Sequence, residues 1–198
     1  MKGHPGTGKS TLARAIAAVL RCPLLDKDDV RDPTFSVQLH LAEASTAGAA
    51  SAALNDLSYA VLWRLVETQI SLGLSVVVDS PLSHRAHLDH LLSIASAAGA
   101  RVAVVECRPG DEAEWHRRLE ARASAAGDAS GGGEGEGWHK PATSVELRRL
   151  IDGYQGRSDY EFGGVPRLVV DSTAAAVAVE DLVDKVMEFV KSDCFVDD

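Results

Sequence analysis

The sequence predicts an α/β fold in which a parallel β-sheet is covered by helices on both faces. Short apolar, β-branched runs alternate with stretches of helical periodicity along the chain, which is the pattern of successive β–α units. A glycine-rich phosphate-binding pattern opens the chain and leads directly into a helix, a loop–helix start that binds phosphate in such folds. The 198 residues, 45% of them hydrophobic, can bury one full core. We therefore expect residues 1–198 to form a single domain.

The first motif is the run GHPGTGKS at residues 3–10, which fits G-x-x-x-x-G-K-[ST]. Glycines carry no Cβ, so the backbone can take positive φ and curl its N–H groups around a phosphate. Lys9 adds a positive charge for the β- and γ-phosphates, and Ser10 offers a hydroxyl to Mg²⁺. We expect the phosphates of a nucleotide to be bound by Gly3, Gly6, Thr7, Gly8, Lys9, Ser10 and Thr11.

Only Met1 and Lys2 precede this loop, whereas a phosphate loop normally follows a buried strand. We expect a shortened start with the first strand largely missing, which would open a gap of about 10 Å in the sheet. Any targeting segment ahead of that strand would be missing as well. Three cysteines without a C-x-x-C pair favour reduced thiols and a cytoplasmic location. No apolar run is long enough to predict a membrane span, and the net charge of −9 argues against a broad nucleic-acid surface.

Residues 11–21 have helical periodicity, and residues 22–25 form a short apolar run that predicts a buried strand. An acidic turn follows at the carboxyl end of this strand, where ligands bind in open α/β sheets. Asp26 or Asp28 is therefore a candidate to accept the proton of an attacking hydroxyl, and Arg31 a candidate to hold an anionic group of the acceptor. The alternative is a solvated turn in which Asp28 or Asp29 caps a helix.

Residues 34–73 predict an acceptor-side region of two helices, broken near residues 46–51. In the second helix one apolar face carries Leu57, Val61, Leu65 and Thr68. Tyr59 in the same helix is a candidate to line an acceptor pocket, together with Asn55 and Trp63. The alternative for the two aromatic residues is packing.

The apolar run at residues 74–78 predicts a strand buried on both faces, and it ends in Asp79. Together with the phosphate loop, an aspartate at this position predicts support for Mg²⁺. Ser80 stands where an ATP hydrolase would tend to carry a glutamate, and neither D-x-x-G nor N-K-x-D follows. These features favour transfer to an acceptor over hydrolysis.

Ser83 is a candidate cap for a helix over residues 83–98, followed by a strand over residues 101–107. The helix carries His84, His87 and His90, whose spacing drifts around it. We expect these histidines to form a solvated face and not a metal site.

Residues 111–157 predict a lid region, beginning with a capping pair of Asp111 and Glu114. Arg118 and Arg122 lie one turn apart on the first lid helix, and guanidinium groups pair well with phosphate oxygens. The alternative is charge on a solvated helix. The glycine-rich stretch at residues 123–137 predicts a disordered tip, and Arg157 is a further lid candidate.

The last strand is expected at residues 167–170, and a closing amphipathic helix at residues 179–190. Its inward face is predicted to carry Leu182, Val183, Val186, Phe189 and Val190.

With these elements in order, the chain resembles the P-loop kinases of small acceptors, which include nucleoside monophosphate, shikimate, gluconate, polynucleotide 5′-hydroxyl and zeta-toxin-like kinases. The resemblance rests on GHPGTGKST at residues 3–11, LLDKDD at 24–29, VVVDS at 76–80 and RLEAR at 118–122. It implies a three-layer α/β/α fold, with the strand before the loop lying between those that end at Asp79 and Cys107. It also implies adenine binding near Ser172 and Thr173.

The hypothesis is a kinase that uses ATP and Mg²⁺ to phosphorylate a hydroxyl or phosphate of a small-molecule acceptor. Lys9 and the loop hold the phosphates, Ser10 and Asp79 organise Mg²⁺, and arginines of the lid region neutralise the transferring group. Asp28, Arg31 and Tyr59 contact the acceptor, and Arg157 and Ser172 contact the nucleotide. One alternative is a nucleotide-binding regulator or slow ATPase without a phosphorylated acceptor, and another is a polynucleotide 5′-hydroxyl kinase. The acceptor and the choice between monomer and homodimer stay open.

Overall fold

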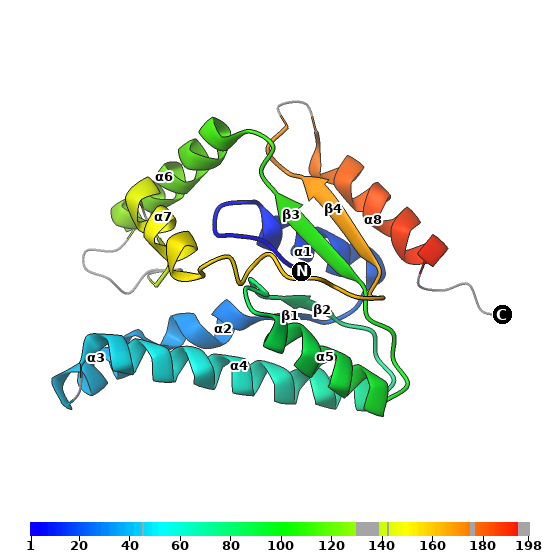
Figure 1. Cartoon of the computed structure of the whole chain (residues 1–198), viewed down its shortest axis with the longest axis horizontal. Helices are drawn as coiled ribbons and strands as arrows, with labels where there is room; N and C mark the ends of the chain where they lie inside the picture. The colour runs from blue at the N-terminus through cyan, green and yellow to red at the C-terminus, as the bar shows by residue number, and fades with distance from the viewer. Residues whose placement is uncertain (45, 130–138, 142, 175–176, 194–198) are drawn as a thin grey trace.

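Two pairs of parallel strands form the centre of the structure, a computed structural model that describes residues 1–44, 46–129, 139–141, 143–174 and 177–193. Strand β1 (Leu24–Asp26) pairs with β2 (Val77–Asp79), residue Asp26 lying opposite Asp79. Strand β3 (Val104–Arg108) pairs with β4 (Arg167–Asp171). The two strands of each pair run parallel, as the alternating sequence pattern predicts (Figure 1).

The first two residues of the chain lie between β2 and β3 and connect the two pairs. The backbone N–H of Lys2 donates to the Val105 carbonyl at 2.8 Å, and the N–H of Cys107 donates to the Lys2 carbonyl at 2.8 Å. On the other side, the amino group of Met1 donates to the Val78 carbonyl at 2.6 Å. The resemblance implies that the segment before the phosphate loop lies between β2 and β3, and this position is therefore confirmed. The prediction of an open gap in the sheet is wrong in part, because Met1 and Lys2 form backbone hydrogen bonds with β2 and β3 at the end of the gap nearest the phosphate loop.

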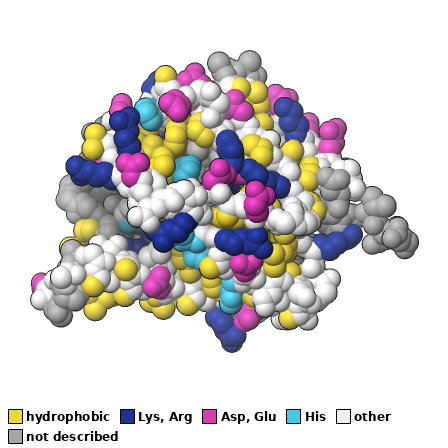
Figure 2. Space-filling model, viewed as in Figure 1, with side chains coloured by type: hydrophobic (Ala, Val, Ile, Leu, Met, Phe, Trp, Pro, Cys, Tyr) yellow, Lys and Arg dark blue, Asp and Glu magenta, His cyan; other side chains and the backbone are white. Residues whose placement is uncertain are grey.

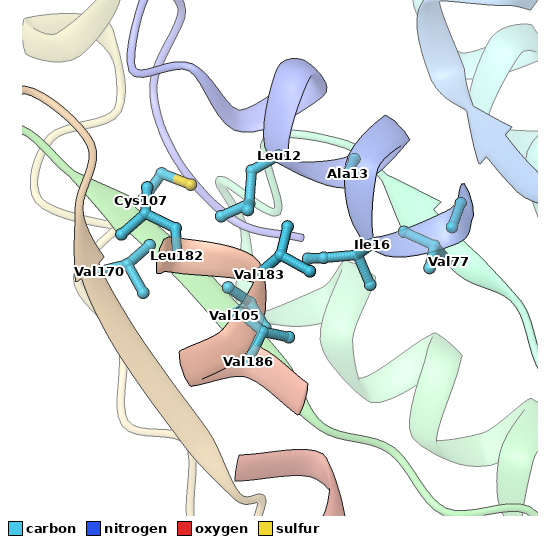
Figure 3. Packing of buried hydrophobic residues seen from close by; sticks show 11 residues of the cluster. Leu12, Ala13, Ile16, Val77, Val105, Cys107, Val170, Leu182, Val183 and Val186 are labelled. Atoms are coloured by element: carbon cyan, nitrogen blue, oxygen red, sulfur yellow. The ribbon is translucent and has the colours of Figure 1, made fainter. Parts of the chain in front are cut away.

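Helices cover both faces of this sheet. On one face, α1 (Lys9–Leu20) and α8 (Val179–Asp193) pack against the strands. Their apolar side chains point toward one another and toward β3 and β4 (Figure 3). On the other face, α5 (Arg85–Ala97) packs through Leu91 and Ile94 beside Leu25 and Val78. The result is the predicted three-layer arrangement.

The region predicted as two helices, residues 34–73, contains α3 (Phe35–Ala44) and α4 (Ala47–Ser71). A short helix α2 (Lys27–Arg31) and a 3₁₀ turn η1 (Asp32–Thr34) precede it. The long helix α4 lies along the lower side of the view (Figure 1). It begins after Thr46, whose hydroxyl accepts from the N–H of Ala49. The break between the two helices therefore lies at the start of the predicted interval, residues 46–51.

The face of α4 singled out by periodicity points to solvent, which corrects its expected role. Leu57 and Leu65 are 52% and 40% exposed, whereas Leu54, Leu62 and Val66 are buried. Both faces of this helix carry apolar side chains, so periodicity alone does not select the buried one. Packing of α4 against α2, α3 and α5 makes that choice.

The lid region contains α6 (Glu112–Ala129) and α7 (Ser144–Gly153), which lie together at the upper left of the view (Figure 1). The N–H of Glu114 donates to Asp111 Oδ1 at 3.0 Å, so the predicted cap is confirmed. The expected loop over residues 123–129 is wrong, because α6 continues through this alanine-rich stretch, and alanine is the strongest helix former. The remainder of the predicted tip, residues 130–137, lies outside the described residues.

Smaller corrections concern element ends. Strands β1 to β4 end one residue later than predicted because Asp26, Asp79, Arg108 and Asp171 complete the ladders. The residue that caps α5 is His84, without a side-chain hydrogen bond, and not Ser83.

Within the described part of the chain, no helix combines the length and apolarity needed to cross a membrane.

Candidate active site

A cavity of about 920 Å³ lies at the carboxyl ends of the strands, where the phosphate loop, α2, α4 and the lid region meet. Most of the predicted site residues line it, contributed by segments far apart in sequence. They include Gly3, Lys9, Asp26, Asp28, Tyr59 and Arg118. Strand ends and helix starts converge here because all strands of a parallel sheet end on the same edge.

The phosphate loop has the backbone geometry that its glycines allow. Gly3, Gly6 and Gly8 have φ values of +149°, +82° and +74°, a region that residues with a Cβ rarely adopt. A Cβ on Gly3 would lie 2.7 Å from the carbonyl oxygen of Cys107. The loop therefore passes too close to β3 for any other residue, and it leads straight into the N-terminus of α1.

Two side chains from distant elements hold this loop in place. Trp115 Nε1 donates to the Pro5 carbonyl at 2.8 Å, and the hydroxyl of Ser172 donates to the Thr7 carbonyl. Arg118 in turn donates to the Ser172 carbonyl at 2.6 Å and to Glu114. Sequence reasoning missed Trp115, because nothing in its local pattern separates it from an ordinary apolar position on α6.

Lys9 and Asp79 form an ion pair at the centre of the site, with Nζ to Oδ1 at 2.5 Å. Asp79 is fully buried, and its second oxygen, Oδ2, has no hydrogen-bond partner among the described residues. A buried carboxylate oxygen with unused capacity suits Mg²⁺, which prefers oxygen ligands and keeps several of its waters. No cluster of three or more His, Cys, Asp or Glu side chains suited to a metal exists in the described ranges. The residues present therefore fit a magnesium ion carried in with nucleotide phosphates.

Asp26 is buried beside Asp79 and caps α2. Its Oδ1 accepts from the N–H of Asp28 at 2.9 Å, so the cap belongs to Asp26 and not to Asp28 or Asp29 as the alternative supposed. Burial, followed by the nearby charge of Asp79, raises the pKa of Asp26 to about 6. This carboxyl group can therefore exchange a proton near neutral pH.

Asp28 lies two residues further on but in the opposite electrostatic environment. Its oxygens lie 2.9 Å from Lys27 Nζ and 2.6 Å from Lys140 Nζ. Burial acts to raise the pKa of Asp28, but the two ammonium groups outweigh it and hold the pKa well below its usual range. His139 lies 2.9 Å from Asp32 in the same cluster. Sequence reasoning missed His139 and Lys140, which follow the glycine-rich stretch.

Arg31 lines the cavity, but the residue is only 1% exposed. Its side chain is hydrogen-bonded to neighbouring elements. It donates to Thr34 Oγ1 at 2.6 Å, Gln38 Oε1 at 2.5 Å and Ser51 Oγ at 3.3 Å. These bonds join α2 to η1, α3 and α4. In this structure Arg31 shapes the acceptor side of the cavity.

Aromatic rings form a wall of the cavity beside the Asp28 cluster, and Lys27 Nζ of that cluster lies 5.8 Å from the centroid of the Tyr59 ring. The buried ring of Tyr59 lies 4.0 Å from that of His87, and His84 lies within 5.8 Å of Tyr154. The expected solvated histidine face is wrong for His84 and His87, because α4 and the segment after α7 cover this side of α5. Burial, more than neighbouring charges, lowers the pKa of His87 to about 4, so this ring is neutral at physiological pH.

Two further arginines of the lid region were predicted to reach the site. Arg157 is exposed and is not among the described cavity-lining residues, and its guanidinium donates to the carbonyls of Tyr154 and Gly153. The side chain of Arg122 lies outside the described residues.

Basic and acidic side chains are interspersed on the face shown in Figure 2, with no broad basic patch there. Nucleic-acid-binding surfaces usually gather Lys and Arg on one face.

Comparisons with known proteins identify the family and the fold. Residues 1–135 match the family described as AAA domain. Among solved structures, a "putative kinase" from Chloroflexus aurantiacus superposes with a TM-score of 0.66 and 21% identity, over 96% of this chain and 93% of that one. A gluconokinase from Sinorhizobium meliloti 1021 superposes with a TM-score of 0.58 and 19% identity, over 96% and 89%. No curated protein matches the chain. The chain belongs to the AAA domain family, and its fold is the α/β P-loop fold found in these kinase structures.

Proposed function

We propose that this protein is an ATP-dependent kinase that phosphorylates a hydroxyl group of a small molecule. The observation that carries the proposal is a cavity of about 920 Å³ lined by the phosphate loop and Lys9, by Asp26 and Asp28, and by Tyr59. A kinase needs both substrates in one enclosed volume, because transfer depends on the acceptor oxygen meeting the γ-phosphorus.

At the nucleotide end, the amides of the loop and the ammonium of Lys9 bind the β- and γ-phosphates. Ser10 and Asp79 would hold Mg²⁺, which neutralises phosphate charge when bound. Arg118, already bonded to the Ser172 carbonyl beside the loop, stabilises charge on the transferring group. Ser172, whose hydroxyl donates to the Thr7 carbonyl of the loop, would contact the nucleotide.

At the acceptor end, Asp26 is the better candidate for the proton acceptor. With a pKa raised to about 6, it is ionised at neutral pH yet basic enough to take a proton. Asp28 is held by two ammonium groups and orients the acceptor. In the reaction the acceptor oxygen bonds to the γ-phosphorus, the bond to the β-phosphate oxygen breaks, the proton passes to Asp26, and ADP leaves.

We favour transfer over hydrolysis because Ser80, the neighbour of Asp79, has no carboxylate to activate water. A nucleotide-binding regulator that hydrolyses ATP slowly would use the same loop but would not need the space around Asp28 and Tyr59. A polynucleotide 5′-hydroxyl kinase is less favoured because of the acidic balance of the chain and the interspersed charges in Figure 2.

The test is incubation with γ-labelled ATP and pooled metabolites, followed by a search for labelled products other than phosphate. A 5′-hydroxyl oligonucleotide is included as a separate acceptor. We expect Lys9→Ala to lower turnover by about 10²-fold or more, while Lys185→Ala, an exposed lysine of α8, leaves it unchanged. Phosphate release without any labelled acceptor would favour the regulator, and equal turnover in Lys9→Ala would refute the role of Lys9.

A further inference from the structure

The acceptor half of the cavity is lined on one side by a chain of rings. Tyr59 on α4 packs on His87 at 4.0 Å between ring centroids, and His87 lies 5.7 Å from His84. His84 meets Tyr154 edge to face at 5.8 Å, and Tyr154 stacks near His4 of the phosphate loop at 6.0 Å. All five line the cavity. The rings therefore extend without interruption from the acceptor end to the nucleotide end.

This wall offers mainly ring surface, with the ammonium of Lys27 5.8 Å from the centroid of the Tyr59 ring. Burial raises the pKa of Tyr59 and of Tyr154 and lowers that of His87, so these three rings are uncharged near neutral pH. Neutral aromatic rings attract planar rings through stacking and apolar contact.

Charged side chains lie beside this wall, and their charges are compensated. Lys27 and Lys140 both lie on Asp28, and His139 lies on Asp32. Arg31 is bonded to Thr34, Gln38 and Ser51. An acceptor carboxylate or phosphate would have to compete with these partners for each cation, at a cost in desolvation.

From this arrangement we infer that the acceptor is an uncharged alcohol that carries a planar ring, such as a nucleoside or a benzenoid alcohol. This inference rests on the proposed kinase function and specifies its substrate class. The ring of the acceptor lies against the Tyr59–His84–His87 wall, and its hydroxyl reaches Asp26 at the boundary with the phosphate loop. A ring-free polyol or a sugar acid would leave the aromatic wall unused.

The test measures binding by ligand-observed NMR and calorimetry with Mg²⁺ and AMP-PNP present, so that the nucleotide end is filled. The probes are uridine and 4-hydroxyphenylethanol, which separate the nucleoside and benzenoid sources, and sorbitol and gluconate, which have no planar ring. Binders are then incubated with ATP, and phosphorylated product is followed by ³¹P NMR. Binding of AMP-PNP alone is recorded first, because its failure would count against the kinase proposal and not against the acceptor class.

We expect a ring-bearing probe to bind and to be phosphorylated, and His84→Ala to weaken its binding about 10-fold. His90→Ala is the matched control, because His90 is exposed on the same helix and is not among the cavity-lining residues described. Tyr59→Phe, which keeps the ring, should bind nearly as the parent does. Preference for gluconate or sorbitol, equal effects of His84→Ala and His90→Ala, or AMP-PNP binding with no ring-bearing probe bound would each overturn the inference.

Discussion

Replacing Asp26 by asparagine should stabilise the fold while removing activity. The pKa of Asp26 rises from its ordinary value of 3.8 to about 6, chiefly because of burial and then because of Asp79. One pKa unit corresponds to about 1.4 kcal/mol, so the ionised carboxylate costs the folded state up to about 3 kcal/mol above pH 6. Asparagine carries no charge, and its side-chain oxygen can still accept from the N–H of Asp28 as a helix cap.

The sign of the pH dependence follows from the direction of this shift. Because the folded-state pKa is raised, the parent protein loses stability as pH rises from about 4 through 6, whereas the asparagine variant does not lose this contribution. The stability gain of Asp26→Asn should therefore be near zero at pH 4 and largest at pH 7 to 8. In the same variant turnover should fall by about 10²-fold or more, since the proton acceptor is gone.

Asp28→Asn is the matched comparison, because it makes the same chemical change two residues away. Lys27 and Lys140 hold the pKa of Asp28 below its usual range, so its loss should destabilise the fold by about 1–3 kcal/mol at neutral pH. Urea unfolding of all three proteins at pH 4 and pH 8 measures these differences. The reasoning is refuted if Asp26→Asn is less stable than the parent at pH 8, or if its gain is the same at both pH values.

Two further predictions concern the phosphate loop. Trp115→Phe removes the hydrogen bond to the Pro5 carbonyl and should weaken binding of AMP-PNP several-fold, about 1 kcal/mol, as measured by calorimetry; unchanged affinity would show that Trp115 does not position the loop. Gly3→Ala forces a Cβ to within 2.7 Å of the Cys107 carbonyl oxygen and should lower the melting temperature by several degrees. Gly48→Ala, in a helix with open space around it, should leave the melting temperature unchanged or raise it slightly, and equal melting of the two variants would contradict the close approach.

Residues that carry their chemistry in a local pattern could be recognised from sequence. The run GHPGTGKS predicts both the loop and the helix after it, because only glycine tolerates the observed backbone angles. Asp26 and Asp79 follow apolar strands, and parallel pairing places the ends of these strands opposite each other. Their meeting at one edge of the sheet was therefore predictable without knowledge of any side-chain contact.

Residues whose role depends on what packs over them could not be recognised in this way. Trp115 and Lys140 reach the site only because α6 and the segment before α7 lie over the loop and α2. His84 and His87 look like surface residues in sequence. In the structure both line the cavity, and His87 packs against Tyr59 of α4. Asp26 and Asp28 are chemically identical and nearly adjacent, yet their pKa values move in opposite directions.

The amino-acid sequence by itself determined the α/β class, the phosphate loop and the strand-end acids, because these follow from backbone geometry and from periodicity over a few residues. Only the tertiary structure decided which face of α4 is buried, which aspartate is paired with lysines and which histidines line the cavity. The physical reason is that burial and electrostatic environment come from neighbours far apart along the chain, and short-range patterns carry no information about them.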